Sequence, residues 1–358
     1  MYIFIHIPFC NSLCNYCDFP KMFYDKKFIS KYLDSLEKEI NQRYKNEPVK
    51  TIYIGGGTPT SLNIVELERL LKITNIFNKD NLVEYTIESN IESLSEEKIK
   101  LLKKYNINRI SLGVESLNND NLKELNRHHT KEQTLKLIKT LKQNKINNIS
   151  IDYIYGINNN INIIKEDINL FLTLDIPHIS CYSLIIEKNT IFGIQKREYI
   201  NEDIEYQMYK YINKTLTQNN YSQYEISNYA KENYESLHHL NYWNNGAYFG
   251  LGLGAVSYLN KRRITNTKNL TKYLNKDYHK EITYESLKIR ISNELILGLR
   301  KIKGIDIKEF QIKYKKDILT LYNIKDLLQE NKLLLENNYL KINPKYLYLS
   351  NEILINLI

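Results

Sequence analysis

The chain has 358 residues, of which 42% are hydrophobic and 25% charged, a composition typical of a folded globular protein. The hydrophobic content excludes a disordered chain, and the 4 Cys and 12 Gly exclude a disulfide-rich scaffold and a collagen-like repeat. The formal charge of +9 comes mostly from scattered lysines, which predicts a solvated basic surface and no nucleic-acid partner, with attraction of an anionic small molecule as the alternative.

Targeting and membrane signals are weak in this sequence. No apolar run approaches the roughly 18 residues that a membrane span needs, and the apolar segment 2–7 has no basic stretch before it. Positive charge is gathered only in the short cluster 261–263, Lys-Arg-Arg. We therefore expect a cytoplasmic protein without a membrane span.

The first half of the sequence alternates short β-like runs with longer helical segments. The β-like runs are apolar and rich in Ile, Tyr or Val, which is typical of buried strands. They cover residues 2–7, 51–54, 83–88, 109–114, 150–155 and 178–184. Between them, segments such as 29–44 and 62–76 repeat apolar residues at helical spacing. This α/β pattern predicts a parallel sheet with crossover helices, closed as a barrel or partial barrel or wound as an open sheet.

Chemically distinctive residues stand where these predicted strands end. Cys10 follows the first strand, Gly55–Gly57 follow the second, Glu88 ends the third, Glu115 follows the fourth and Asp152 lies near the end of the fifth. A barrel carries its chemistry at the carboxyl ends of its strands. The sequence therefore predicts a functional site at this edge of the sheet.

The second half of the chain is organised differently. The alternation stops near residue 200, and a glycine-rich passage at 246–254 predicts either close packing against a large flat ligand or a tight structural crossing. From Glu285 onward we expect short helices closed by a β-like tail over 339–353. These changes divide the chain into a barrel domain over 1–280, with an extension over 200–280, and a small C-terminal domain over 281–358.

Three of the four cysteines, Cys10, Cys14 and Cys17, fall within eight residues. In a cytosolic protein this clustering indicates metal binding rather than disulfides. Three thiolates suit an iron–sulfur cluster with one open iron, and a zinc site completed by His6 is the alternative. Cys181 lies alone on an apolar strand, which predicts a packed core thiol.

The run Gly55-Gly56-Gly57-Thr58-Pro59 is conspicuous in a chain with so little glycine. Consecutive glycines let the backbone approach a ligand and expose amide donors, so this turn could hold the charged end of a bound cofactor. A tight strand-to-helix turn is the alternative. A phosphate-binding loop is excluded, because no Lys-Ser/Thr pair follows at the required spacing.

These motifs together resemble a known family. The Cys-x3-Cys-x2-Cys spacing with Tyr16 before the last cysteine resembles the radical S-adenosylmethionine (SAM) superfamily. Segments 6–10, 18–19, 55–59, 111–115 and 152–156 resemble its oxygen-independent coproporphyrinogen III oxidase-like branch, from Tyr2 to roughly Tyr258. The resemblance implies a partial (β/α)6 TIM-type barrel of the radical SAM type, with a small, mostly helical C-terminal domain.

The resemblance also implies a cofactor set. A [4Fe-4S] cluster would be bound by Cys10, Cys14 and Cys17, and SAM would chelate its open iron and be cleaved reductively to a 5′-deoxyadenosyl radical. We assign no catalytic residue. The residues implied in SAM binding are Phe4, Tyr16, Gly56, Gly57, Thr58, Glu88, Glu115, Arg127 and Asp152. Two of these depart from the family pattern, because Phe4 stands where Tyr is usual and Glu115 where Gln is usual.

A second set of residues separates two branches of the family. Decarboxylating oxidases carry a further cysteine at the position of Phe19, and its absence favours the heme-binding branch. Segment 238–243, His-His-Leu-Asn-Tyr-Trp, resembles the His-Asn-x-x-Tyr-Trp signature of that branch, with His239 in place of Asn. We therefore predict His238 as a heme ligand, with a packed histidine pair as the alternative. His128 and His129 are expected at the surface beside Arg127.

The resulting expectation is a heme chaperone that binds a [4Fe-4S] cluster, SAM and heme and delivers heme to a recipient hemoprotein. The alternative is radical decarboxylation of coproporphyrinogen III to protoporphyrinogen IX. The cluster 261–263 could pair with porphyrin propionates or stay solvated. The sequence leaves open whether SAM is cleaved productively, whether the chain forms a homodimer, and whether it associates peripherally with a membrane through its recipient.

Overall fold

The computed structural model describes residues 1–321, 323–355 and 357. Its centre is a nine-stranded sheet with the order β11-β1-β4-β5-β6-β7-β8-β10-β9. All neighbours from β11 to β8 are parallel, and β10 and β9 are antiparallel. The strands are β1 (Tyr2–Ile7), β4 (Thr51–Gly56), β5 (Glu84–Asn90), β6 (Arg109–Glu115), β7 (Ile149–Tyr155), β8 (His178–Ser183), β9 (Ser222–Gln223), β10 (Asn228–Ala230) and β11 (Phe249–Leu251).

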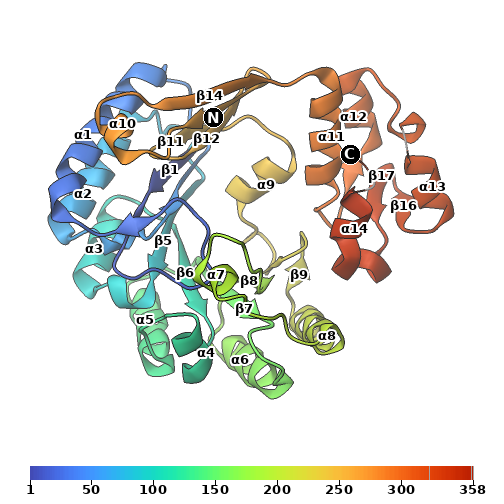
Figure 1. The fold of residues 1–358 in the computed structure, drawn as a ribbon, viewed down its shortest axis with the longest axis horizontal. Helices are drawn as coiled ribbons and strands as arrows, with labels where there is room; N and C mark the ends of the chain where they lie inside the picture. The colour runs from blue at the N-terminus through green and yellow to red at the C-terminus, as the bar shows by residue number, and fades with distance from the viewer. Residues whose placement is uncertain (322, 356, 358) are drawn as a thin grey trace.

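Helices follow the parallel strands and lie outside the curved sheet (Figure 1). The long ones are α1 (Lys26–Arg43), α2 (Ile64–Ile73), α3 (Glu96–Lys104), α5 (Lys131–Gln143), α6 (Ile161–Thr173) and α8 (Glu202–Gln218). Several start at side-chain caps, as where Asn63 accepts from the amide of Glu66 and the Glu66 carboxylate accepts from the amide of Asn63. The predicted strands and crossover helices are confirmed, and together they form the partial barrel that the sequence indicated.

Side chains of β1 point alternately to the two faces of the sheet, toward the helices on one face and toward the cavity on the other. Ile3, Ile5 and Ile7 are fully buried in the main hydrophobic core with side chains of the helical layer. The intervening residues Phe4 and His6 point to the other face and line a cavity. One strand therefore supplies both the packed layer and the wall of the interior.

Smaller elements surround this barrel. β2 (Phe9–Cys10) pairs with β3 (Met22–Phe23), and β12 (Val256–Leu259), β13 (Arg262–Asn266) and β14 (His279–Tyr284) form an antiparallel sheet. The short helices are α4 (Asn119–Glu124), α7 (Ile191–Ile194), α9 (Leu237–Trp243) and α10 (Leu270–Leu274). In Figure 1, α9 lies between the sheet and the C-terminal helices.

The C-terminal part has a hydrophobic core of its own, formed by residues from Leu295 to Leu357. Its elements are α11 (Leu287–Gly298), α12 (Ile307–Tyr314), α13 (Ile324–Gln329), α14 (Ser350–Ile355) and a sheet of β15 (Ile305–Asp306), β16 (Leu333–Glu336) and β17 (Tyr339–Ile342). The division at 280/281 stays a prediction, and β14 crosses it.

The β-like tail over 339–353 was predicted wrongly beyond its first four residues. The chain leaves β17 at Ile342, forms a 3-10 helix over Pro344–Leu349 and ends in α14. Asn343 caps the 3-10 helix by accepting from the amide of Lys345. Pro344, which cannot donate to a strand ladder, begins this turn, so the apolar residues after it belong to helical structure.

No helix in the described part of the chain combines the length and the apolar character that crossing a membrane requires.

Candidate functional site

The strand ends meet at one cavity of about 620 Å³. β2 brings Cys10 to it, the end of β4 brings the glycine turn, and β5, β6 and β7 contribute Glu88, Glu115 and Asp152. The structure brings together all the predicted cluster and SAM residues except Phe4. The members present are Cys10, Cys14, Tyr16, Cys17, Gly56, Gly57, Thr58, Glu88, Glu115, Arg127 and Asp152. Phe4 instead lines the adjoining cavity, and its assignment to the SAM site stays a prediction.

The three cysteines reach this cavity from β2 and from the loop that follows it. The Thr58 hydroxyl donates to Cys10 Sγ at 3.7 Å, and burial raises the pKa of Cys10 to about 11. Burial also raises the pKa of Cys17, against the opposing charge of Lys21. Metal binding would therefore release the protons of these thiols into solvent, because the thiolate is the form that binds metal.

The donor set fits a cluster better than a single ion. Among the described residues, no three His, Cys, Asp or Glu side chains are arranged to hold a metal ion. His6, the fourth ligand of the zinc alternative, has its Nε2 2.7 Å from the carbonyl oxygen of Pro20 and lines the neighbouring cavity. Three thiols spread around one cavity suit a body of several irons, each bound by a different thiolate.

The glycine turn is shaped by crowding on three sides. A Cβ at Gly55 would lie 2.6 Å from the Glu88 carboxyl carbon, and one at Gly56, where φ is +113°, would lie 2.5 Å from the His6 ring. A Cβ at Gly57 would meet Cys10 Sγ at 2.9 Å. No side chain is accommodated at any of these positions without a shift.

The amides of this turn already have partners in the protein. The amide of Gly56 donates to Glu88 at 2.9 Å, and the amides of Gly57 and Thr58 donate to the carbonyls of Ile7 and Phe9, each at 2.8 Å. The prediction that the turn offers free amides to a ligand is therefore not supported. The glycines instead let the turn pack against the cysteine loop, the tight-turn alternative.

Buried carboxyl groups line the same cavity as the cysteines. Burial raises the pKa of Glu88 to about 7, although the Gly56 amide and the Tyr53 hydroxyl donate to it. Burial likewise raises the pKa of Glu115 to about 7, with Arg127 acting in the other direction. Asp152 accepts from the Ser111 hydroxyl at 3.1 Å, and its pKa is raised by burial. These groups can accept hydrogen bonds from hydroxyls or an ammonium group.

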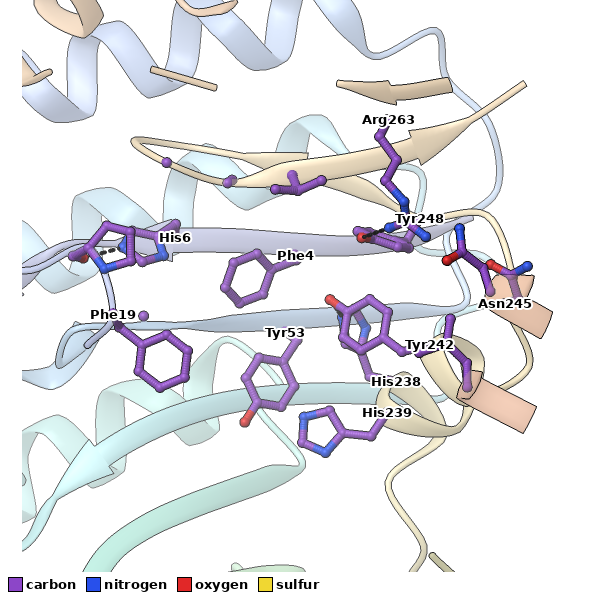
Figure 2. Close-up of a pocket in the computed structure, with 18 of the residues that line it drawn as sticks. Phe4, His6, Phe19, Tyr53, His238, His239, Tyr242, Asn245, Tyr248 and Arg263 are labelled. Atoms are coloured by element: carbon purple, nitrogen blue, oxygen red, sulfur yellow. Dashed lines mark hydrogen bonds between the residues drawn. The ribbon is translucent and has the colours of Figure 1, made fainter. Parts of the chain in front are cut away.

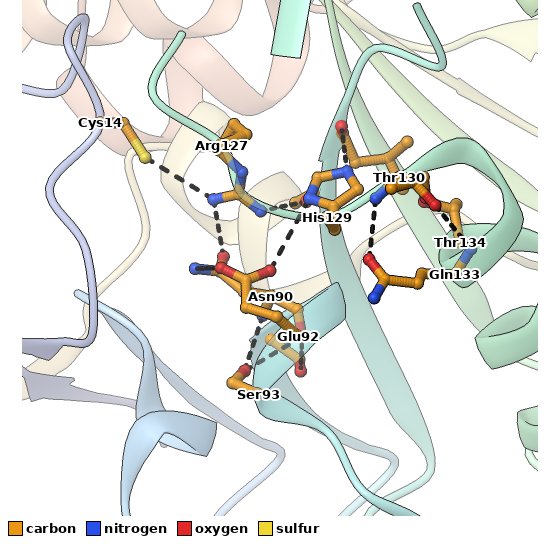
Figure 3. A network of polar contacts seen from close by, with 12 residues as sticks. Cys14, Asn90, Glu92, Ser93, Arg127, His129, Thr130, Gln133 and Thr134 are labelled. Atoms are coloured by element: carbon orange, nitrogen blue, oxygen red, sulfur yellow. Dashed lines mark hydrogen bonds and ion pairs between the residues drawn. The ribbon is translucent and has the colours of Figure 1, made fainter. Parts of the chain in front are cut away.

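Arg127 connects the cysteine loop to the sheet (Figure 3). Its Nη1 donates to Cys14 Sγ at 3.6 Å and to Asn90 Oδ1 at 2.9 Å, and its Nη2 donates to the carbonyl of Gly113. Although burial alone would lower the pKa of Arg127, Tyr16, Cys14 and Glu115 raise it above its ordinary value. The guanidinium is thus a fixed cation beside a predicted cluster ligand.

His129 also belongs to this network, contrary to the prediction of a surface position. Its side chain is buried, with Nε2 3.2 Å from the carbonyl of Val114 and Nδ1 3.7 Å from Glu92. Burial would raise the pKa of Glu92, but His129 and Arg127 outweigh it and lower the pKa to about 2. His128 is exposed, as expected.

A second cavity, of about 490 Å³, adjoins the first (Figure 2). The two share the wall residues Phe19, Tyr53, Gly56, Glu88 and His239. The rest of the second cavity is lined mainly by aromatic and aliphatic side chains, which include Phe4, Tyr242, Tyr248, Ile296 and Leu297. Arg263 is one of its few polar residues. Aromatic surfaces with a few placed polar groups are typical of a site for a small organic ligand.

His238 is packed into the wall of this second cavity. Its side chain is fully buried, with Nδ1 2.7 Å from Thr51 Oγ1 and Nε2 2.8 Å from the Tyr242 hydroxyl. With both ring nitrogens engaged, His238 is not supported as a heme ligand, and it corresponds to the packed alternative.

Sequence reasoning missed two residues of the site. Tyr53 donates to Glu88 and lines both cavities, and Asn90 accepts from Arg127. Tyr53 lies on the same face of β4 as Thr51 and Gly55, so the period of two could have placed it on the interior face. Asn90 carried no comparable signal, because β5 extends two residues beyond its predicted end.

Comparison with known proteins agrees with this architecture. The sequence profile described as "Radical SAM superfamily" matches residues 4–171. The coproporphyrinogen III oxidase HemN of Escherichia coli, described as a radical SAM enzyme, superposes with a TM-score of 0.86 over 99% of this chain and 89% of its own, at 20% identity. The fold and the cysteine site thus define a member of the radical SAM superfamily.

Full-length relatives narrow this class. The "Heme chaperone HemW" of Lactococcus lactis is 38% identical over 98% of this chain and 95% of its own length. That of Bacillus subtilis is 36% identical over 91% of both chains. The chain belongs to the HemW family.

Proposed function

We propose that this chain binds heme and delivers it to a recipient hemoprotein in the cytoplasm, and that it also binds a [4Fe-4S] cluster and SAM. The observation that carries this proposal is the pair of adjoining cavities. One collects three cysteines and several buried ionisable groups, and the other is lined mainly by aromatic and aliphatic side chains. The names of the HemW relatives support the same function.

The cofactor residues divide by chemistry. Cys10, Cys14 and Cys17 would hold the cluster, and Arg127 fixes Cys14 through its hydrogen bond to the thiol sulfur. Glu88 and Asp152 present carboxyl oxygens suited to hydroxyl and ammonium groups of SAM. When bound, the cluster and SAM supply one-electron reductive chemistry. The chain's own contribution is to bind and orient these groups in a largely buried site.

Phe19 separates this proposal from the decarboxylase alternative. It stands at the position where the oxidases of the family carry a further cysteine, and it lines both cavities. No thiol from this position reaches the boundary between the cavities. Heme transfer without porphyrin decarboxylation is therefore the activity we expect.

The test is an anaerobic incubation of cluster-loaded, reduced protein with SAM and coproporphyrinogen III, alongside a titration with heme followed by absorbance. We expect stoichiometric heme binding, no decarboxylated porphyrin, and transfer of heme to an apo-hemoprotein acceptor. Formation of protoporphyrinogen IX, or no heme binding, would overturn the proposal.

The cysteine assignment has its own control. Cys14→Ser is expected to lower the iron and sulfide content after reconstitution, because it removes a thiolate from the cavity. Cys181→Ser changes a buried thiol that lines neither cavity and should leave both contents near wild type. Equal losses in the two variants would contradict the assignment.

A further inference from the structure

Two consecutive histidines of α9, His238 and His239, both line the second cavity but differ in their hydrogen bonds. Successive residues of a helix point about 100° apart, so the two rings differ in their hydrogen-bond partners although both lie beside Tyr53 and Tyr242. The start of the helix is fixed, because Glu84 accepts from the amides of Leu237 at 2.7 Å and His238 at 3.2 Å. The direction of each imidazole therefore follows from the anchored backbone.

His238 lies in the wall of the second cavity and does not line the first. Its ring is fully buried, and its two nitrogens lie within hydrogen-bond distance of the hydroxyls of Thr51 and Tyr242. Binding a metal through either nitrogen would break one of these contacts, with no solvent to replace the lost partner. His238 therefore fixes α9 against β4.

His239 is turned toward the cavities. Its ring lines both of them and lies 5.1 Å from the Tyr53 ring, centroid to centroid. The ring of Tyr242 stacks beside it at 6.3 Å with an interplanar angle of 25° (Figure 2). Within the described residues the ring of His239 makes no hydrogen bond, so its nitrogens are not engaged as those of His238 are.

The ring of His239 is held in its neutral form. Burial, with Arg109 as a further cause, lowers the pKa of His239 to about 3. A neutral imidazole keeps a nitrogen lone pair, which is the form that binds metal ions. The uncharged ring thus faces a cavity whose walls are aromatic and aliphatic.

The rest of this cavity suits a porphyrin. Phe4, Tyr53, Tyr242 and Tyr248 offer flat surfaces, and Arg263 contributes a cation whose Nε is 2.5 Å from Glu285. A macrocycle with acidic side groups matches this combination of apolar walls and a basic group. The chemistry of the cavity thus agrees with the ligand of the proposed function.

We propose that His239, and not His238, provides the imidazole that binds the porphyrin iron in the cavity bounded by Phe4, Tyr53 and Tyr242. This inference rests on the proposed function and specifies its ligand residue. The role of His238 is then to position α9, through Thr51 and Tyr242, so that His239 faces the cavity.

The experiment titrates the full-length protein with Fe(III)-protoporphyrin IX and records its absorption and electron paramagnetic resonance spectra. We expect His239→Ala to shift the Soret band, to lose the nitrogen-ligated spectrum and to weaken heme affinity at least tenfold. Added imidazole should restore the nitrogen-ligated spectrum. His128→Ala, which removes an exposed imidazole outside both cavities, should behave as wild type.

His238→Gln keeps a side chain able to donate and accept, and we expect a lower melting temperature with the wild-type heme spectrum at low temperature. An unchanged spectrum and affinity in His239→Ala would overturn the inference even if His238→Gln failed to fold. The inference would also be overturned if folded His238→Gln lost the nitrogen-ligated spectrum while His239→Ala kept it. That result would still establish heme binding by the wild-type protein. Absence of heme binding in the wild type would instead overturn the proposed function and this inference together.

Discussion

Glu225 lies between β9 and β10 and is only 2% exposed. Its carboxylate accepts from the amide of Ser227 at 3.1 Å, yet burial dominates and raises its pKa from 4.5 to about 7. In the unfolded chain this carboxyl ionises near its ordinary value. Unfolding therefore releases a proton between these pKa values, and Glu225 lowers the stability of the fold as pH rises from 4.5 to about 7.

Replacing the Glu225 carboxyl by an amide removes the loss of folding stability that its ionisation causes. Glu225→Gln should be more stable than wild type above the raised pKa, by up to about 3 kcal/mol at about 1.4 kcal/mol per pKa unit. The gain should fade as the pH approaches 4.5. Urea denaturation across this range measures it, with exposed Glu198→Gln as the control. A gain of equal size at every pH would contradict the ionisation argument.

At the scale of elements, the sequence allowed the six barrel strands to be predicted because each is a short apolar run of its own. The strand β11 was not predicted, since Phe249–Leu251 includes a glycine and its partner β1 lies at the other end of the barrel domain. The strand β16 was not predicted either, although the sequence contains a turn signal directly after it. Asn337 and Asn338, with φ of 52° and 65°, form the tight connection between β16 and β17.

The functional site, like the fold, could be predicted only in part from the sequence. Cysteine spacing and strand order indicated that the cysteines, the glycine turn and the carboxyl groups gather in the first cavity, whereas Tyr16 and Arg127 were implied only by the family resemblance. Spacing and strand order could not show which histidine of α9 lines both cavities, because that depends on the helix rotation set by Glu84 and Thr51. The buried position of His129 depends likewise on its contacts with Val114 and Glu92, distant in sequence.

The glycine turn allows a test of crowding separate from backbone strain. Gly57→Ala would place a Cβ 2.9 Å from Cys10 Sγ and from the carbonyl of Phe9, so we expect displacement of Cys10 and reduced iron and sulfide after reconstitution. The overpacking should also destabilise the fold by about 1–3 kcal/mol.

Gly156→Ala is the matched control for this prediction. Gly156 has a φ of +80°, but its nearest neighbour to a Cβ would be 3.6 Å away, so the cost is strain without crowding. We expect about 1–2 kcal/mol of destabilisation and normal iron content. Equal iron loss in both variants would show that general destabilisation, rather than contact with Cys10, controls cluster assembly.

At the scale of the whole molecule, the wall of the second cavity combines elements of the barrel with α11 of the C-terminal part. β1, β4 and α9 form one part of its wall, and Asn293, Ile296 and Leu297 of α11 form another. The C-terminal part, which has a separate hydrophobic core, thus lines the cavity of the proposed heme site through α11. A change on α11 should alter heme binding without touching the cysteines.

Leu297→Arg tests whether α11 affects heme binding independently of the cysteine site. The added guanidinium would place charge and volume in an apolar wall, so we expect heme affinity to fall about tenfold, equivalent to about 1.4 kcal/mol. Iron and sulfide content should stay at the wild-type level. Leu287→Arg, at an exposed position of the same helix, is the control and should change neither property. Loss of iron in Leu297→Arg would indicate that the two sites are not independent.

The pairing of β11 with β1 also bears on how the chain is made. Ile3 pairs with Phe249, which is synthesised 246 residues later. At about 5–20 residues per second, a ribosome would need roughly 12–50 s to supply the missing neighbour. During that interval the outer edge of the apolar first strand remains open to other chains. Nascent chains that stall before β11 should therefore be the ones that chaperones capture and that aggregate first.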